Sequence, residues 1–367
     1  MEHRKFGKTG LTPSILGFGM MRLKRDAEGK FDEQWSIETL RHAIDNGLTY
    51  VDTAYIYGES ERITGLCLQD GYREKVTLAT KLPIYNMTCE EDFDRFLDEQ
   101  LERLQTDCID VYLLHALSRE CWDERVVKFR VLEHAEKAKA AGKIKHLGFS
   151  FHDNLDAFRY ILNAYDKWEF CQIQLNYMDV NYQAGLQGLR EAHEKGLAVV
   201  IMEPLRGGAL AKVSEDVAAL LPGDPVESAL DFLWNMPEVN VVLSGMSERE
   251  QVEQNMRYAE RAHVGMLSPE QIDKMIEAGD KMRKVMSIPC TGCNYCDVCP
   301  KGIAIPQLFT LHNQRQLDGD TAAAEVKYKA LGEKNSDNCI GCGVCAEHCP
   351  QHIDIPQKME KLRKYYN

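Results

Sequence analysis

Cysteine is concentrated near the C-terminal end of this sequence. Eight of the 13 cysteines fall in two short runs, and the other five are scattered along the chain. Four thiolates at such short spacing can converge on one cube of iron and sulfide, so two quartets predict two [4Fe–4S] clusters. The eight residues are Cys290, Cys293, Cys296, Cys299, Cys339, Cys342, Cys345 and Cys349.

The details of the two runs favour iron–sulfur clusters over zinc or disulfides. The second run has the spacing C-x2-C-x2-C-x3-C-P of bacterial ferredoxins. Gly292, Gly341 and Gly343 allow the backbone to pass close to inorganic sulfur, and a proline follows the last cysteine of each run. A zinc ribbon would need only four cysteines. We therefore interpret all eight as cluster ligands.

The two runs belong to an internal repeat. Cys299 and Cys349 are each followed at once by a proline and, six residues on, by an Ile-Pro pair. In duplicated cluster-binding halves the last cysteine of each run binds the other cluster. The first run departs from this pattern, because two residues rather than three precede its last cysteine. Exchanged and unexchanged ligand sets therefore both remain open.

A second group of residues with chemical potential follows successive apolar runs. Asp52 and Tyr57 come after the second such run, Lys81 after the third and His115 after the fourth. Each of them alone is weak evidence, because a single His or Lys at such a place is usually structural or solvated. An Asp–Lys ion pair that only closes the fold is the alternative interpretation. Together, the four residues indicate an active site.

These residues need a scaffold in which strand ends meet, and the apolar pattern predicts one. Eight strand-like runs alternate with helical patterns, and continuous apolar runs indicate strands buried on both faces of a parallel sheet. This pattern predicts a (β/α)8 TIM barrel, whose chemistry lies at the C-terminal strand ends. A doubly wound sheet would need a glycine-rich fingerprint after the first strand, which residues 17–22 lack. The predicted strands are 15–17, 49–51, 76–80, 109–114, 144–149, 170–175, 198–202 and 240–243, and the predicted helices include 33–46, 90–104, 123–141, 182–194 and 249–258.

The remaining chain predicts a small α-helical ferredoxin-like domain. A helical pattern over 271–285 ends at Pro289, and two more helical patterns, 305–315 and 321–331, lie between the cysteine runs. We therefore divide the chain into a barrel over residues 1–283 and a cluster domain over residues 284–367.

On these residues the sequence resembles the aldo-keto reductase family. The stretch from Asp52 to Gly58 is similar to that family's strand-two signature, and Lys81 and His115 fall where its other two catalytic residues lie. The whole chain is similar to the subgroup with a C-terminal ferredoxin-like domain. The resemblance implies an NAD(P)H-dependent oxidoreductase that reduces an aldehyde or ketone to an alcohol.

Carbonyl reduction needs a hydride donor and a proton donor, and the four residues can supply the proton. Tyr57 is the expected general acid, although a free tyrosine has a pKa of about 10. The ammonium of Lys81, held by Asp52, would stabilise the phenolate and lower that pKa. His115 would hydrogen-bond the carbonyl oxygen and orient it.

By the resemblance, the cofactor is NADPH or NADH bound in an extended form. Ser150 and Gln172 match residues that hold the nicotinamide carboxamide, although Phe151 stands where the family usually has Asn. Gly245 and Gln251 stand where a Lys and an Arg often bind the 2′-phosphate, so both coenzymes remain open. Residues 203–208 follow the seventh predicted strand, where the family wraps the pyrophosphate, and residues 244–255 follow the eighth, where it holds the adenosine end. The implied cofactor-binding residues are Gly19, Met20, Asp52, Ser150, Gln172, Glu203, Leu205, Gly207, Ser244, Gly245, Met246, Gln251, Gln254 and Asn255.

Net charge and composition restrict the partners and the cellular location that we expect. The net charge of −13 argues against nucleic acid as a partner, because phosphate binding needs clustered Lys and Arg. The sequence has no run of eighteen apolar residues and no apolar signal segment at Met1, so we expect no membrane span and a cytoplasmic, reducing location. The expected partners are a small-molecule carbonyl substrate and a redox partner protein.

A second function remains open at this point. The clusters could exchange electrons with a redox partner while the barrel is a nucleotide-binding or docking scaffold. Hydride transfer moves two electrons together and each cluster moves one, so such a protein would need a carrier that divides the pair. The clusters could also be purely structural.

Overall fold

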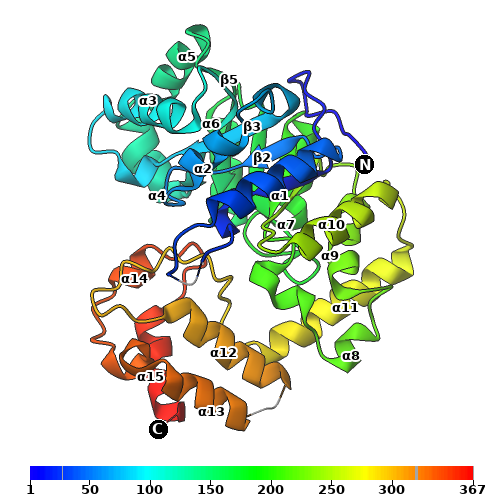
Figure 1. The fold of residues 1–367 in the computed structure, drawn as a ribbon, viewed down its shortest axis with the longest axis vertical. Helices are drawn as coiled ribbons and strands as arrows, with labels where there is room; N and C mark the ends of the chain where they lie inside the picture. The colour runs from blue at the N-terminus through cyan, green and yellow to red at the C-terminus, as the bar shows by residue number, and fades with distance from the viewer. Residues whose placement is uncertain (27, 319–320, 367) are drawn as a thin grey trace. The chain divides into compact units, whose positions relative to one another are not determined.

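The structure has the predicted barrel. The computed structural model describes residues 1–26, 28–318 and 321–366. Eight parallel strands close on one another in chain order, from β1 to β8, and helices surround them (Figure 1). Each predicted strand is present, with bounds shifted by at most three residues. The strands are β1 (Leu16–Gly19), β2 (Tyr50–Asp52), β3 (Thr77–Leu82), β4 (Ile109–Leu117), β5 (Ile144–Phe151), β6 (Phe170–Gln174), β7 (Ala198–Met202) and β8 (Val241–Ser244).

The N-terminal segment closes one end of the barrel. It turns back on itself as a hairpin, in which the Phe6 amide donates to the Leu11 carbonyl at 2.8 Å. The Phe6 ring is buried in one apolar cluster with side chains of the strands. The Arg4 guanidinium donates to the carbonyls of Trp234 at 2.6 Å and Val239 at 2.7 Å. The polar side chains predicted to be catalytic, such as Asp52 and Lys81, lie at the opposite end, where the strands finish.

The predicted helices are present with starts shifted by at most three residues, except that one of them is divided. Asp32 and Asn154 are N-caps, and each side chain accepts a backbone N–H of the first turn. The predicted helix over 123–141 is wrong as one element, because Arg130 has a left-handed backbone with φ +49° that interrupts it. The helices of the barrel are α1 (Glu33–Asp45), α2 (Ser60–Cys67), α3 (Asp92–Leu104), α4 (Arg119–Cys121), the π-helical η4 (Trp122–Val127), α5 (Val131–Ala140), α6 (Leu155–Ala164), α7 (Gly185–Glu194), α9 (Pro225–Trp234) and α10 (Arg249–Arg261).

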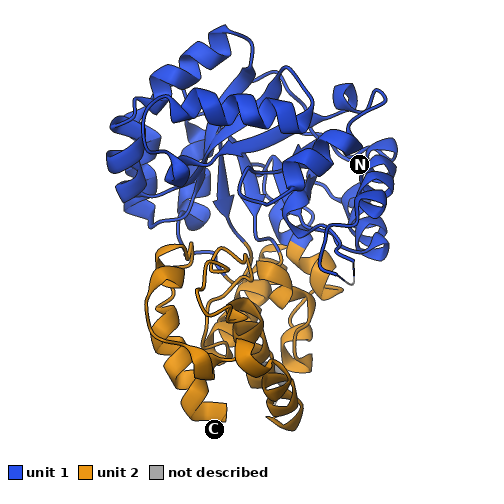
Figure 2. Ribbon diagram, turned by 60° about the vertical axis from the view of Figure 1, so that its left-hand side comes forward, with its two compact units in different colours: residues 1–175, 179–204, 230–267 blue, residues 176–178, 205–229, 268–367 orange. Residues whose placement is uncertain are grey.

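The chain forms two compact units, and the second has its own core (Figure 2). It comprises residues 176–178, 205–229 and 268–367. Apolar side chains such as Leu308 and Met359 are buried there, and the rings of Tyr328 and Tyr366 stack at 4.3 Å. The predicted domain boundary at residue 283 stays a prediction. The helices of this second unit are α8 (Glu215–Ala218), α11 (Pro269–Val285), α12 (Ile305–Asp318), α13 (Thr321–Ala330), α14 (Val344–Glu347) and α15 (Ile355–Tyr366).

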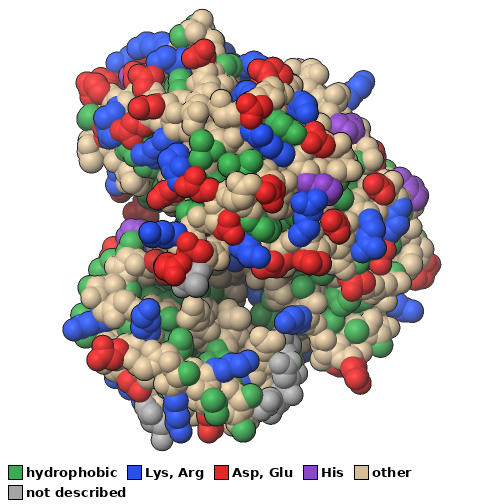
Figure 3. Space-filling view, viewed as in Figure 1, with side chains coloured by type: hydrophobic (Ala, Val, Ile, Leu, Met, Phe, Trp, Pro, Cys, Tyr) green, Lys and Arg blue, Asp and Glu red, His purple; other side chains and the backbone are tan. Residues whose placement is uncertain are grey.

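The surface carries charges of both signs. On the face drawn in Figure 3, Asp and Glu side chains are interspersed with Lys and Arg. None of the described helices is both long enough and apolar enough to cross a membrane.

Close packing of α2 on α3 generates a first prediction. A Cβ at Gly65 would lie 2.5 Å from the carbonyl oxygen of Arg103. Because that atom is main chain, Gly65→Ala must push the two helices apart. We expect the free energy of unfolding to fall by about 1–3 kcal/mol, measured by denaturant titration. Unchanged stability would show that the helices are not packed this closely.

Candidate active site and cluster domain

A buried ion pair lies at the ends of β2 and β3. The Lys81 ammonium donates to Asp52 Oδ1 at 2.6 Å and to the Thr53 carbonyl at 2.8 Å. The Lys81 side chain is 0% exposed and the Asp52 side chain 4%. Burial lowers the pKa of Lys81, whereas the carboxylates of Asp52 and Glu61 act in the opposite direction. The pair therefore holds a positive charge away from water.

The other two predicted catalytic residues face this pair. The Lys81 ammonium lies 5.1 Å from the centre of the Tyr57 ring. The rings of Tyr57 and His115 meet edge to face at 6.0 Å. Burial, reinforced by the nearby charges of Lys81 and His152, lowers the pKa of His115 well below its usual value. The His115 imidazole is therefore neutral at neutral pH, and the structure brings all four predicted residues together.

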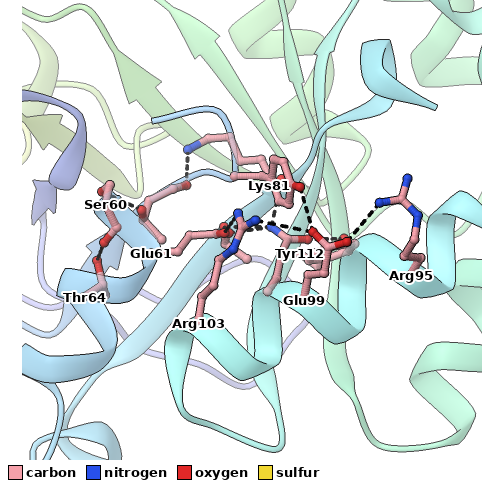
Figure 4. A network of polar contacts seen from close by, with 12 residues as sticks. Ser60, Glu61, Thr64, Lys81, Arg95, Glu99, Arg103 and Tyr112 are labelled. Carbon is pink, nitrogen blue, oxygen red and sulfur yellow. Dashed lines mark hydrogen bonds and ion pairs between the residues drawn. The ribbon is translucent and has the colours of Figure 1, made fainter. Parts of the chain in front are cut away.

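A polar network behind Lys81 was missed by the sequence analysis. Glu61 on α2 accepts from the Thr80 hydroxyl and from Gln100 on α3, both at 2.6 Å. Figure 4 shows this network continuing through Arg103 toward Glu99 at its outer end. The only signal in the sequence was that Glu61 and Gln100 occupy the buried faces of their helices, where apolar residues are expected.

Two residues predicted to hold the nicotinamide carboxamide lie side by side. Ser150 on β5 and Gln172 on β6 are paired in the sheet register, and both are buried. The Ser150 hydroxyl accepts the backbone N–H of Ala116 at 2.7 Å. Among the described residues, no hydrogen-bond donor reaches Gln172 Oε1, although this atom is buried. An amide group of a bound ligand would fit this vacant acceptor.

Most of the residues predicted near the adenosine end already have protein partners. Asn255 donates to the Ser244 hydroxyl at 2.9 Å, and Gln254 donates to the Tyr258 hydroxyl at 2.8 Å. Gln251 accepts the backbone N–H groups of Ser247 and Glu248 as part of a capping box. The Gln251 amide therefore caps α10 in this structure.

Four other predicted cofactor-binding residues belong to the first unit. Gly19 ends β1, and a Cβ there would lie 3.4 Å from the Ser244 carbonyl oxygen. The Met20 carbonyl accepts the Ser60 hydroxyl at 2.9 Å. Gly245 packs against the side chain of Arg22, and Met246 is buried. These contacts put all of them at the ends of β1 and β8.

The loop that follows β7 leads into the second unit. Glu203 has a left-handed backbone with φ +56° and still belongs to the first unit, whereas Leu205 and Gly207 belong to the second. Gly207 lies directly against the first cysteine run, because a Cβ there would be 1.9 Å from the Thr291 carbonyl oxygen. The predicted pyrophosphate loop and the first cluster loop are thus packed together.

The cysteine runs also converge across the internal repeat. Cys299 from the first run lines one pocket together with Cys339, Cys342 and Cys345 from the second. Burial raises the pKa of the Cys345 thiol to about 11, and the sulfur of Cys299 contributes to this rise. In the described part of the chain, no three His, Cys, Asp or Glu side chains are arranged as ligands of a single metal ion.

The other four cysteines converge in the same manner. Burial raises the pKa of the Cys296 thiol, and the sulfurs of Cys293, Cys290 and Cys349 raise it further. The Gly292 backbone N–H lies 3.4 Å from the sulfur of Cys290. Cys299 thus lies with the second run, and Cys349 lies close enough to Cys296 of the first run to affect its thiol. The exchange of cluster ligands itself stays a prediction.

Comparison with known families agrees with this geometry. The model of the "Aldo/keto reductase family" matches residues 15–279, and that of the "4Fe-4S dicluster domain" matches residues 289–353. The chain therefore belongs to the aldo-keto reductase family and carries a 4Fe–4S dicluster domain. It is an oxidoreductase of a family that typically binds NADP(H).

Individual relatives support the same family, and a solved structure shares the fold. Aldo-keto reductase YhdN of Bacillus subtilis is 36% identical over 174 residues, which cover 43% of this chain and half of that relative. L-galactose dehydrogenase of Arabidopsis thaliana is 29% identical over 70% of this chain and 87% of the relative. The holo form of aldo-keto reductase AKR11C1 from Bacillus halodurans shares the fold with a TM-score of 0.64, at 24% identity over 76% of this chain and 96% of that one.

Gly207 and Gly208 offer a matched pair of variants. Both have left-handed backbones, with φ +66° and +96°, but only Gly207 has a neighbour within reach of a Cβ. We expect Gly208→Ala to cost only the backbone strain, about 1 kcal/mol. Gly207→Ala should destabilise the protein by a larger amount, because it also displaces the Thr291 main chain, and it should lower the iron content. Thermal unfolding and iron analysis measure both effects, and equal effects of the two changes would contradict the contact.

Proposed function

We propose that this protein is an NAD(P)H-dependent carbonyl reductase that converts an aldehyde or ketone to an alcohol. The observation that carries the proposal is the buried Lys81–Asp52 ion pair, which faces the Tyr57 ring. A buried lysine charge is costly unless it is paired, so its place beside a tyrosine and a neutral histidine favours a catalytic role.

Each of the four side chains has a separate role in the proposed reduction. A bound nicotinamide dinucleotide supplies the hydride that reaches the carbonyl carbon. Tyr57 donates its hydroxyl proton to the carbonyl oxygen, which completes the alcohol and leaves a phenolate. The Lys81 ammonium stabilises that phenolate, and Asp52 holds the ammonium in place. The neutral His115 donates a hydrogen bond that orients the carbonyl oxygen and supports its developing charge.

The sheet register supports the residues proposed for the nicotinamide end. Ser150 and Gln172 on neighbouring strands would hold the carboxamide, with Gln172 Oε1 accepting its amide N–H. The loop around Leu205 and Gly207 would pass along the pyrophosphate, and Asn255 would contact the adenine. NADPH and NADH both remain within the proposal, since Gln251 is already used as a helix cap.

The cysteines would hold two [4Fe–4S] clusters with their last ligands exchanged. Cys299 lines the pocket of the second run, and Cys349 lies beside Cys296 of the first. The first cluster would take Cys290, Cys293, Cys296 and Cys349, and the second would take Cys339, Cys342, Cys345 and Cys299. We place this domain at residues 284–367.

Tyr57→Phe tests the reductase. The change removes the proton donor and little else, so we expect kcat for aldehyde reduction to fall by at least about 100-fold. NADPH and NADH binding, followed by nucleotide fluorescence, should be retained. Tyr55→Phe is the matched control, because Tyr55 lies two residues away and donates to Glu99. Undiminished turnover in Tyr57→Phe would refute the proposed function.

Iron analysis of cysteine variants tests the clusters and their ligands. The anaerobically purified protein should contain about eight iron and eight acid-labile sulfide per chain. Changing Cys339, Cys342 and Cys345 together to Ser should leave about four iron. A further Cys349→Ser change should then lower the remaining iron, whereas Cys299→Ser should not. The opposite result would establish unexchanged sets, and bound zinc without sulfide would refute the clusters.

A further inference from the structure

Glu61 is a buried carboxylate that the proposed mechanism does not use. It lies on α2, four residues after Tyr57, and its side chain is 0% exposed. Its Oε1 accepts from the Thr80 hydroxyl and from Gln100 Nε2, both at 2.6 Å. Its Oε2 lies 3.4 Å from the Arg103 guanidinium, whose side chain is 35% exposed. Burying a carboxylate is costly, so a buried carboxylate with three such partners indicates a specific role.

Gln100 connects this carboxylate to the main chain of the active-site lysine. Its Nε2 lies 3.1 Å from the Lys81 carbonyl oxygen as well as 2.6 Å from Glu61. Its Oε1 accepts the Tyr112 hydroxyl of β4 at 2.7 Å, which fixes the orientation of the amide. Thr80 and Lys81 are consecutive on β3, so Glu61 and Gln100 hold both residues from behind the barrel wall (Figure 4).

The charges around Lys81 also indicate an electrostatic role for Glu61. Burial lowers the pKa of Lys81, and the negative charge of Glu61 is one of the effects that raise it. Burial raises the pKa of Glu61 itself, but Thr80, Gln100 and Arg103 favour its ionised form. A low-dielectric interior strengthens the attraction between these charges.

The groups that face the two side chains are few. Glu61 faces Arg103 on α3, Lys81 on β3 and Tyr112 on β4. Lys81 faces Asp52 on β2, Tyr57 in the following loop and His115 on β4. Apart from Lys81 itself, Arg103 is the group among these that carries a positive charge and offsets Glu61.

We propose that Glu61, acting through Gln100, is a positioning residue for Lys81: it fixes the main chain of the lysine and supplies a second negative charge that keeps the ammonium protonated. This inference rests on the proposed function, in which the ammonium supports the proton donor Tyr57. It extends the site beyond the four proposed catalytic residues to a fully buried carboxylate on α2.

The first test compares the pH dependence of kcat/KM in two variants of the full-length holoprotein. Glu61→Gln keeps the shape of the side chain and removes its charge. The ammonium then loses its proton at lower pH, so the alkaline limb of the profile should shift down by about half a unit or more. Glu99→Gln is the matched control, because Glu99 also binds Arg103 but lies at the outer end of the network. Its profile should match the wild type.

A second variant predicts a shift in the opposite direction. Arg103→Gln leaves Glu61 charged at alkaline pH but removes the positive charge that offsets it. The ammonium should then hold its proton to higher pH, and the alkaline limb should move up. Because Arg103 is partly exposed, this variant tests the proposal even where Glu61→Gln fails to fold. Shifts that are absent or reversed in Arg103→Gln would overturn the proposal.

A direct titration separates this inference from the proposed function. The lysine side-chain signals of isotope-labelled protein can be followed by NMR, with Lys81 assigned from the signal missing in Lys81→Met. The Lys81 signal should titrate at lower pH in Glu61→Gln than in the wild type. Carbonyl turnover that fails in the wild type would refute the reductase alone. A Lys81 titration unchanged by Glu61→Gln, with only stability reduced, would show that Glu61 merely joins the helices.

Discussion

The candidate active site depends on one interaction, the ion pair between Lys81 and Asp52 inside the barrel. Removing an ammonium from water costs several kcal/mol, which only a partner at hydrogen-bond distance can offset. That distance is 2.6 Å here, and a closed barrel keeps it, because β2 and β3 are neighbours with Asp52 in register with Ala79. The fold therefore sets the electrostatics that Tyr57 and His115 need, and a site on loops alone would not fix them.

The cluster domain faces a similar constraint, because eight thiols repel one another once they ionise. They can remain close only where backbone turns direct their sulfurs toward a common centre. Gly292, Gly341 and Gly343 have left-handed backbones that provide such turns. Position 207 also requires a glycine, because a side chain there would overlap with the Thr291 carbonyl group. The loop after β7 and the first cysteine run are thus built to fold together.

The sequence predicted what depends on local pattern and spacing. Apolar runs predicted all eight strands, and the order of Asp52, Tyr57, Lys81 and His115 along consecutive strand ends predicted that they would meet. Contacts between residues far apart in sequence had no such signal. Glu61 and Gln100 fall on the buried faces of their helices, but the sequence does not show which residues they contact, and Arg130 carries no mark of a left-handed backbone. The packing of Gly207 on Thr291 joins residues 84 positions apart.

The proposed carbonyl reduction and the iron–sulfur clusters differ in how many electrons they transfer at a time. The proposed carbonyl reduction needs a hydride, which is an electron pair, whereas a [4Fe–4S] cluster exchanges one electron at a time. In the proposed mechanism, Lys81 and the three residues that face it would therefore complete a reduction without any cluster taking part. An influence of the clusters on that reduction would instead pass through the chain, and the Gly207–Thr291 contact is a place where the predicted nucleotide loop and a cluster loop share main-chain packing. On this argument any effect of the clusters on the proposed reduction would depend on the shape of that loop, and electron exchange with a partner would be a separate activity.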